Sequence, residues 1–93
     1  MFSIQKISRF ERDVNRLVRK NREVVSLYEH ALTVLGVDPY NTSRQYRIKE
    51  LTDVKAGEGQ WRLTVGQYRI RYDINGKIVE LLSMKPRKDA YKD

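Results

Sequence analysis

The sequence has no cysteine and a single histidine, His30. Without cysteine the chain can form neither disulfides nor thiolate metal sites, and a reducing compartment suits it. It also lacks a long apolar run and a signal-peptide pattern, so we expect a soluble, cytoplasmic protein with no membrane partner. His30 falls opposite the apolar stripe of its predicted helix, where a histidine is usually a surface residue. We therefore expect neither a bound metal nor a cofactor.

Acidic residues are scarce relative to basic ones. Nineteen Lys and Arg residues stand against twelve Asp and Glu residues, which gives a formal charge of +7 and a pI of about 9.9. So basic a chain of 93 residues points to a polyanionic partner, most often nucleic acid, or to an acidic protein segment. At 40% hydrophobic residues there is enough apolar material for one core, so we expect residues 1–93 to form a single domain.

Two tight turns predict a β-meander in the C-terminal third of the chain. Asn75-Gly76 lies between two alternating segments and predicts a type I′ hairpin turn, which needs a positive φ at both central residues. Gly66-Gln67 is a second two-residue turn, in which glycine supplies the positive φ of type II′. The segment that begins at Gln60 is therefore expected to form three consecutive antiparallel strands, followed by a short basic tail.

These turns also fix which residues lie opposite each other in neighbouring strands. Around the first turn Arg62 faces Arg71, and around the second turn Arg71 faces Glu80. Since side chains alternate between the two faces of a sheet, the strands divide into two surfaces. The predicted core face carries Trp61, Leu63, Val65, Tyr68, Ile70, Tyr72, Ile74, Val79 and Leu81. The open face carries Arg62, Thr64, Arg69, Arg71, Asp73 and Glu80, with Ile78, Leu82 and Met84 beside them.

The N-terminal half predicts a short strand and two helices. Residues 2–7 alternate imperfectly between apolar and polar side chains, as in a short strand. Apolar residues then recur at helical spacing over residues 8–19, behind a capping box from Ser8 to Glu11, and again over residues 24–35, before Gly36 ends the helix. Residues 38–59 are predicted to be irregular. The expected fold is a two-layer α+β domain, in which an N-terminal strand and an antiparallel helical hairpin cover the antiparallel β-meander.

The open face has the features of a phosphate-binding surface. Arg62 and Arg71 repel each other across the sheet, so a purely structural function would favour residues of opposite sign at these positions. The planar fork of arginine also matches phosphate oxygens better than lysine does. The alternative is a surface network in which Glu80 and Asp73 neutralise the two arginines.

Further basic residues extend this surface, and they are interleaved with a tyrosine. Lys49 and Lys55 project from the irregular segment. The end of the chain adds Lys85, Arg87, Lys88 and Tyr91. Such a mixture suits RNA, because positive charge holds the backbone and a ring can stack on an unpaired base. We predict RNA contacts for Lys49, Lys55, Arg71 and Lys88.

Any catalysis on this face has to use arginine, lysine and tyrosine. The sequence offers no Ser/His/Asp set, no phosphate-cradling glycine loop and no paired carboxylates on the open face. Basic groups and a tyrosine are sufficient for RNA cleavage by the neighbouring 2′-hydroxyl, which mainly demands positioning and stabilisation of charge on the phosphorane. Surrounding positive charge would also lower the pKa of a tyrosine from its ordinary value of about 10, toward that of a useful base.

The run GEGQWRLTVGQYRIRYDING (residues 57–76), the strand after it and the motif PRKDAY (residues 86–91) together resemble the RelE/ParE family of toxins from bacterial and archaeal toxin–antitoxin systems. The resemblance spans nearly the whole chain and favours the RelE branch. It implies the toxin of a type II system, an mRNA interferase that enters the ribosomal A site and cuts mRNA there by 2′-hydroxyl attack, without a metal.

The resemblance also implies functions for particular residues. Arg69, in the family's YR motif, would stabilise the transition state, and Arg62 is the basic position on the preceding strand. Lys85 or Arg87 would take the place of the tail arginine that supports the leaving group. Tyr91 would be the tyrosine that orients or deprotonates the 2′-hydroxyl, or that stacks on a base.

Two positions depart from the RNA-cleaving members of the family. Thr64 stands where they have a second basic residue, and Pro86 stands where some have a histidine, so the general base stays open. One alternative is a ParE-like toxin that inhibits DNA gyrase and cuts no RNA. Another is a relative that has lost toxicity and only binds an antitoxin.

The family further implies a partner protein, the cognate RelB-like antitoxin, besides the ribosome and mRNA. We expect a monomeric free toxin that forms a hetero-oligomer with this antitoxin. Ile78, Leu82 and Met84 are the predicted apolar contacts for it.

Overall fold

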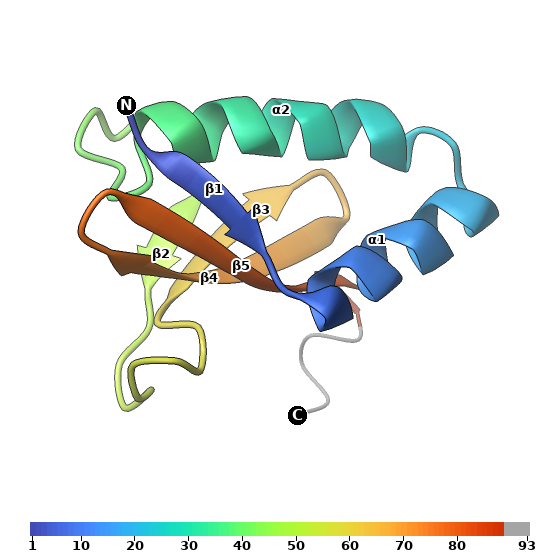
Figure 1. Ribbon diagram of the computed structural model, residues 1–93. Coiled ribbons are helices and arrows are strands. Elements are labelled where there is room, and N and C mark those ends of the chain that lie inside the picture. The colour runs from blue at the N-terminus through green and yellow to red at the C-terminus, as the bar shows by residue number, and fades with distance from the viewer. Residues whose placement is uncertain (89–93) are drawn as a thin grey trace.

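The computed structural model describes residues 1–88, which form two helices and a five-stranded mixed sheet (Figure 1). In chain order the elements are β1 (Ser3–Lys6), α1 (Ser8–Lys20), α2 (Val24–Val37), β2 (Ile48–Glu50), β3 (Trp61–Val65), β4 (Tyr68–Asn75) and β5 (Ile78–Pro86). The strand order is β1-β5-β4-β3-β2, with β1 parallel to β5 and the other neighbours antiparallel. Neither helix in this part of the chain is long and apolar enough to cross a membrane.

Both helices bury their apolar stripes against one face of the sheet, so the predicted two-layer α+β architecture is confirmed. Figure 1 shows α2 lying along the sheet, while α1 follows β1 at one end. α1 packs against β5, and α2 packs against β1 and β3. The core cluster draws on both helices and three strands: Phe10, Val14, Leu17, Val24, Ala31, Val34, Leu35, Leu63, Val65, Ile70, Tyr72, Val79, Leu81 and Met84.

The helix boundaries lie close to the predicted ones, but the ends are formed differently. α1 begins at Ser8 with Ile7 as its N-cap, and no side chain caps it. The predicted capping box between Ser8 and Glu11 is therefore wrong; the N–H of Glu11 instead donates to the carbonyl of Ile7 (3.2 Å). α2 continues through Gly36 to Val37, because Gly36 keeps a negative φ there rather than turning the chain.

The first hairpin of the meander has the predicted register. Val65 pairs with Tyr68 across the Gly66-Gln67 turn, and the pairing continues to Trp61 and Tyr72. Gly66 has a φ of +55°, which suits the first central position of a type II′ turn. A two-residue turn with one glycine therefore suffices to place every residue of β3 and the first half of β4.

The second hairpin differs from the prediction by its turn. Asn75 pairs with Ile78, so the two-residue loop is Gly76-Lys77 and not Asn75-Gly76. Only Gly76 has a positive φ (+61°), as in type II′, whereas Asn75 remains in the strand. The predicted type I′ turn is wrong because its first residue extends β4 by one position.

A β-bulge then corrects the prediction for the end of β5. Tyr72 pairs with Leu81 but Arg71 pairs with Ser83, so β5 carries one extra residue, Leu82, at this point. Arg71 therefore lies opposite Ser83, not Glu80. The extra residue also reverses which side chains point inward beyond it. Met84, predicted on the open face, is 1% exposed and belongs to the core.

The segment predicted to be irregular contains a further strand, β2. It pairs with β3 in antiparallel register, with Lys49 opposite Arg62. At the other edge, β1 pairs with β5, and the N–H of Ile7 donates to the carbonyl of Leu81 (3.3 Å). This pairing places the first turn of α1 beside the C-terminal half of β5.

Candidate functional site

The outer face of the sheet, opposite the core, carries two rows of cross-strand neighbours. The first row follows the register across four strands: Lys49, Arg62, Arg71 and Ser83. The second row lies beside it: Thr64, Arg69 and Lys85. The predicted opposition of Arg62 and Arg71 is confirmed. Five of these seven side chains are basic, so the register concentrates positive charge on one surface.

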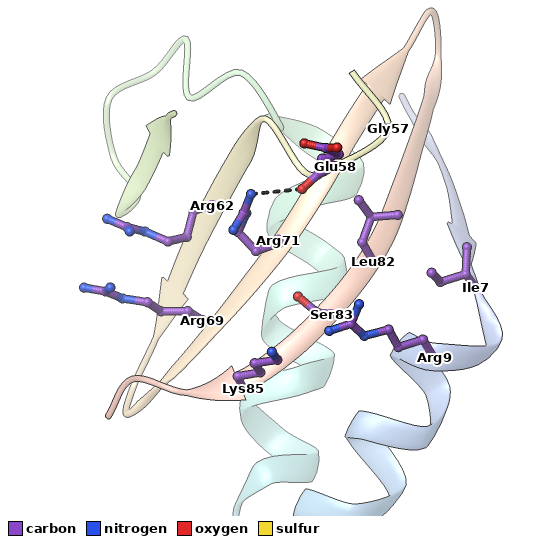
Figure 2. Close-up of a pocket in the computed structure, with 10 residues that line it drawn as sticks. All are labelled: Ile7, Arg9, Gly57, Glu58, Arg62, Arg69, Arg71, Leu82, Ser83 and Lys85. Carbon is purple, nitrogen blue, oxygen red and sulfur yellow. Dashed lines mark hydrogen bonds between the residues drawn. The ribbon is translucent and has the colours of Figure 1, made fainter. Parts of the chain in front are cut away.

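These rows border a pocket of about 330 Å³ (Figure 2). Its lining comes from the start of α1, the loop before β3 and three strands: Ile7, Arg9, Gly57, Glu58, Arg62, Arg69, Arg71, Leu82, Ser83 and Lys85. Figure 2 shows the side chains of Arg62 and Arg69 extending in the same direction from neighbouring strands. Five basic residues and one carboxylate line this pocket, so it attracts anions.

Arg71 is held by backbone carbonyls. Its Nε donates to the carbonyl of Gly59 and its Nη2 to the carbonyl of Glu58, both at 2.9 Å. A Cβ on Gly59 would lie 3.0 Å from Cβ and Nε of Arg71, and Gly59 has a φ of +85°, so glycine is required at this contact. Since carbonyls carry no net charge, these bonds fix the guanidinium while its positive charge still faces the pocket.

The carboxylate of Asp73, predicted in one alternative to neutralise the arginines, binds the backbone of the neighbouring loop instead. The carboxylate of Asp73 accepts hydrogen bonds from the N–H groups of Gly59 (3.2 Å) and Gln60 (2.8 Å). Glu80 lies opposite Asp73 on the neighbouring strand. Asp73 and Arg71 therefore hold the same loop from two sides, one through its N–H groups and the other through its carbonyls.

Arg69 occupies the outer face but is nearly buried. Only 6% of it is exposed, although it lines the pocket, and it was predicted to lie off the core. Its position on the face is confirmed, while its burial was not expected. A buried guanidinium interacts more strongly with an anion than an exposed one does, because less water screens the charge.

The structure brings together three of the five predicted catalytic residues: Arg62, Arg69 and Lys85. Arg87 is exposed just beyond β5, where its backbone N–H donates to the carbonyl of Gln67 (2.6 Å), and it does not line the pocket. Tyr91 lies outside the described residues.

The predicted RNA-binding residues lie at different places in the structure. Arg71 lines the pocket, and Lys49 continues its row on the edge strand β2. Lys55 and Lys88 are exposed but do not line the pocket.

The three predicted antitoxin contacts lie in three different environments. Leu82 is half-buried at the pocket, and Ile78 is half-buried beside Ser3 of β1. Met84 is corrected to a core residue, as described above, because the bulge at Leu82 turns it inward.

Two residues of α1 contribute to this region and were not singled out from the sequence. Arg9 lines the pocket, and Figure 2 shows it beside Ser83. Asp13 is 4% exposed, and its carboxylate accepts from the N–H of Met84 (3.1 Å) and from Nη2 of Arg16 (2.8 Å). No local sequence signal marks them, because the parallel pairing of β1 with β5, which brings α1 to this end of the sheet, joins segments far apart in the chain. Within residues 1–88 no group of three or more His, Cys, Asp or Glu side chains forms a metal site.

No family model matches the sequence, and no curated protein matches it. Solved structures share its fold. A chain of the RelBE2 toxin–antitoxin complex from Mycobacterium tuberculosis matches with a TM-score of 0.70 and 22% identity, over 92% of this chain and 98% of that one. YafQ from Escherichia coli BL21(DE3) matches with a TM-score of 0.71 and 15% identity, over 98% and 99%.

The RelB–RelE antitoxin–toxin complex from Methanococcus jannaschii contributes a third match, with a TM-score of 0.62 and 20% identity over 95% of both chains. The protein therefore has the fold of the RelE and YafQ structures, and the family resemblance found in the sequence is confirmed at the level of the fold.

Proposed function

We propose that this protein is the toxin of a type II toxin–antitoxin system and acts as a ribosome-dependent mRNA endoribonuclease. The observation that carries the proposal is the convergence of Arg62, Arg69 and Lys85 in one pocket on the outer face of a RelE-like fold. A basic pocket without a metal-ligand cluster among residues 1–88 suits a phosphodiester whose own 2′-hydroxyl is the nucleophile.

In this reaction the 2′-hydroxyl gives its proton to a general base, for which Tyr91 is the candidate that the resemblance implies, and its oxygen attacks phosphorus. The bond from phosphorus to the 5′-oxygen of the next nucleotide then breaks. The products are a 2′,3′-cyclic phosphate and a 5′-hydroxyl. The guanidinium groups of Arg62 and Arg69 would donate to the non-bridging oxygens, where negative charge increases in the phosphorane. Lys85 would protonate or hydrogen-bond the leaving 5′-oxygen. Lys85 is preferred over Arg87 for this step because it lines the pocket.

The partner of the free toxin would be a RelB-like antitoxin, and two of the matching structures are toxin–antitoxin complexes. An antitoxin segment that covers the outer face would close the pocket, with Leu82 and Ile78 as apolar contacts at its margin. Ribosome and mRNA would be the targets in the cytoplasm once the antitoxin is removed.

The proposal is tested by mapping mRNA 5′ ends after brief induction of the protein in cells without its antitoxin. We expect cuts inside translated codons that disappear when translation is blocked or when Arg69 is changed to Gln. Arg44→Gln is the matched control, because Arg44 is exposed and lines neither the sheet pocket nor the neighbouring groove on α1. Growth arrest with intact mRNA and inhibited supercoiling would contradict the proposal in favour of a gyrase inhibitor. No cuts and no arrest would leave only an antitoxin-binding protein.

A further inference from the structure

A second groove runs along α1 and joins the pocket on the sheet. The two share Arg9 and Lys85. The groove continues past Arg12, Arg16 and Arg19, so its basic residues form one uninterrupted series with those of the pocket. We call Arg9, Arg12, Arg16 and Arg19 the arginine stripe.

The spacing of the stripe places its four side chains on one side of the helix. Successive members are three, four and three residues apart, which is the spacing of neighbours on a helical surface. From Arg9 to Arg19 the stripe covers ten residues, a length of about 15 Å at 1.5 Å per residue. A ligand that contacts the whole stripe must therefore be extended and must carry several negative charges.

This arrangement is unfavourable for the helix itself. Like charges three or four residues apart destabilise an isolated helix by about 0.2–0.5 kcal/mol per pair, and the stripe contains three such pairs. Arg9 also lies in the first turn, where the helix dipole disfavours positive charge. The core contacts of α1 come from Phe10, Val14 and Leu17 on its other side. Arg16 is offset by Asp13, and Arg19 lies in the last turn, where the helix dipole favours positive charge. Neither interaction accounts for Arg9 and Arg12, which points to a ligand.

Asp13 is the one carboxylate among the described residues that line the groove, and it leaves most of the positive charge in place. It is buried and bonded to the N–H of Met84, and its second oxygen accepts from Arg16. Arg16 remains 64% exposed at its side chain. Asp13 therefore fixes one member of the stripe and anchors α1 to β5 next to Lys85.

We propose that the arginine stripe binds the ribose–phosphate backbone of the same RNA strand whose reacting phosphate lies in the sheet pocket. The strand would leave the pocket between Lys85 and Arg9 and then follow α1. This inference rests on the proposed function. An RNA strand fits better than an acidic protein segment, because the groove lining contains only Arg, Lys, Asp and Asn side chains. Protein interfaces depend on an apolar centre, whereas repeated phosphates need only positive charge.

The test compares the double variant Arg12→Gln/Arg19→Gln with the charge-matched control Arg44→Gln/Lys77→Gln, whose residues are exposed and line neither cavity. Fluorescence anisotropy measures binding of a single-stranded RNA dodecanucleotide and of a trinucleotide over a range of salt concentrations. For the dodecanucleotide, each lost phosphate contact lowers the slope of log K against log salt by about 0.7. The stripe variant should therefore lose about 1.4 in slope and about 25-fold in affinity near 0.1 M salt. Its trinucleotide affinity should change less than about twofold, because a short strand reaches only the pocket.

Equal losses in the stripe variant and the control would overturn the inference, because they would reflect net charge alone. So would a stripe variant that keeps its dodecanucleotide affinity, or one that loses affinity only for an oligoglutamate peptide. Thermal unfolding of both variants checks that they are folded. The result is also separable from the proposed function. If the slope changes as expected but the wild-type protein makes no cuts in the mapping experiment, the proposed nuclease activity fails while the RNA-binding stripe stands.

Discussion

Two arginines on β4, two residues apart and on the same face, define two different regions of the outer surface. In the region near residues 57–59, Arg71 donates to the carbonyls of Glu58 and Gly59. In the neighbouring region Arg69 lines the pocket between its strand partners Thr64 and Lys85. Because both residues are arginines on β4, the difference between them comes from the groups that surround each side chain. The loop carbonyls hold Arg71 in place, whereas Arg69 lies in a row with Lys85, where we propose that it contacts an anionic ligand.

This comparison predicts opposite consequences for the same substitution. Arg69→Gln should lower the rate of mRNA cleavage on ribosomes by about 100- to 1,000-fold, the usual cost of removing one donor to a developing negative charge. The variant should still unfold in one cooperative transition, because Arg69 lies outside the core cluster. Arg71→Gln should instead destabilise the fold by about 1–3 kcal/mol, because two backbone carbonyls lose their donors.

Single-turnover cleavage on programmed ribosomes and urea unfolding measure the two effects separately. Arg71→Gln should also speed amide exchange in residues 57–59 and lower cleavage by less than about tenfold. If both variants lose cleavage equally and keep full stability, the division of the outer face into two regions is wrong.

A second comparison is between Met84 and Leu82 of β5, which the bulge places on opposite faces of the sheet. Met84→Ala should cost at least about 2 kcal/mol, the lower end for truncating a buried Met, because the residue is 1% exposed in the core. Leu82→Ala, two residues away on the outer face, should cost less than about 1.5 kcal/mol since Leu82 is only half-buried. Chemical unfolding of the two variants gives both values. Equally small losses for the two variants would restore the simple alternation that the turn alone predicts, in which both side chains lie on the outer face.

The two hairpin turns show how much of the fold could be predicted from the sequence. Gly66 fixed the first turn, and with it the opposition of Arg62 and Arg71, because only one loop register suits its positive φ. In the second hairpin Gly76 also has the positive φ, but nothing local specifies whether Asn75 belongs to the turn or to the strand.

The site was predictable in its charge and less so in its shape. Arg62 and Arg69 follow from strand alternation and pairing, which are local, whereas Lys85 reaches the outer face only because the bulge at Leu82 shifts the register of β5. β2 escaped notice because an edge strand of three residues, Ile48–Glu50, is too short to carry a periodic signal. Arg9 and Asp13 depend on where α1 meets β5, a contact between segments about 70 residues apart in the chain, as in the bond from Met84 to Asp13. No spacing within α1 encodes such a contact.

The last prediction, with the smallest expected effect on stability, concerns the inner face of β4, which is apolar where the outer face is charged. Tyr72 is fully buried, and its hydroxyl donates to the carbonyl of Pro39 (2.7 Å). Burial, aided by the negative charge of Asp38, raises the pKa of Tyr72 above its ordinary value of about 10. The unfolded chain therefore releases this proton at lower pH than the folded protein, so the contribution of Tyr72 to stability is complete below about pH 10 and is lost as pH rises toward the raised pKa.

Tyr72→Phe should remove this part of the alkaline loss while costing about 1 kcal/mol near pH 7 through the missing hydrogen bond. Urea unfolding between about pH 7 and pH 11 measures both, and the difference between the two proteins cancels the titration of the other tyrosines and of the lysines. Parallel curves for the two proteins would mean that the phenol of Tyr72 reaches solvent in the folded state. In that case water would reach the apolar face of β4 more readily than the burial of Tyr72 indicates.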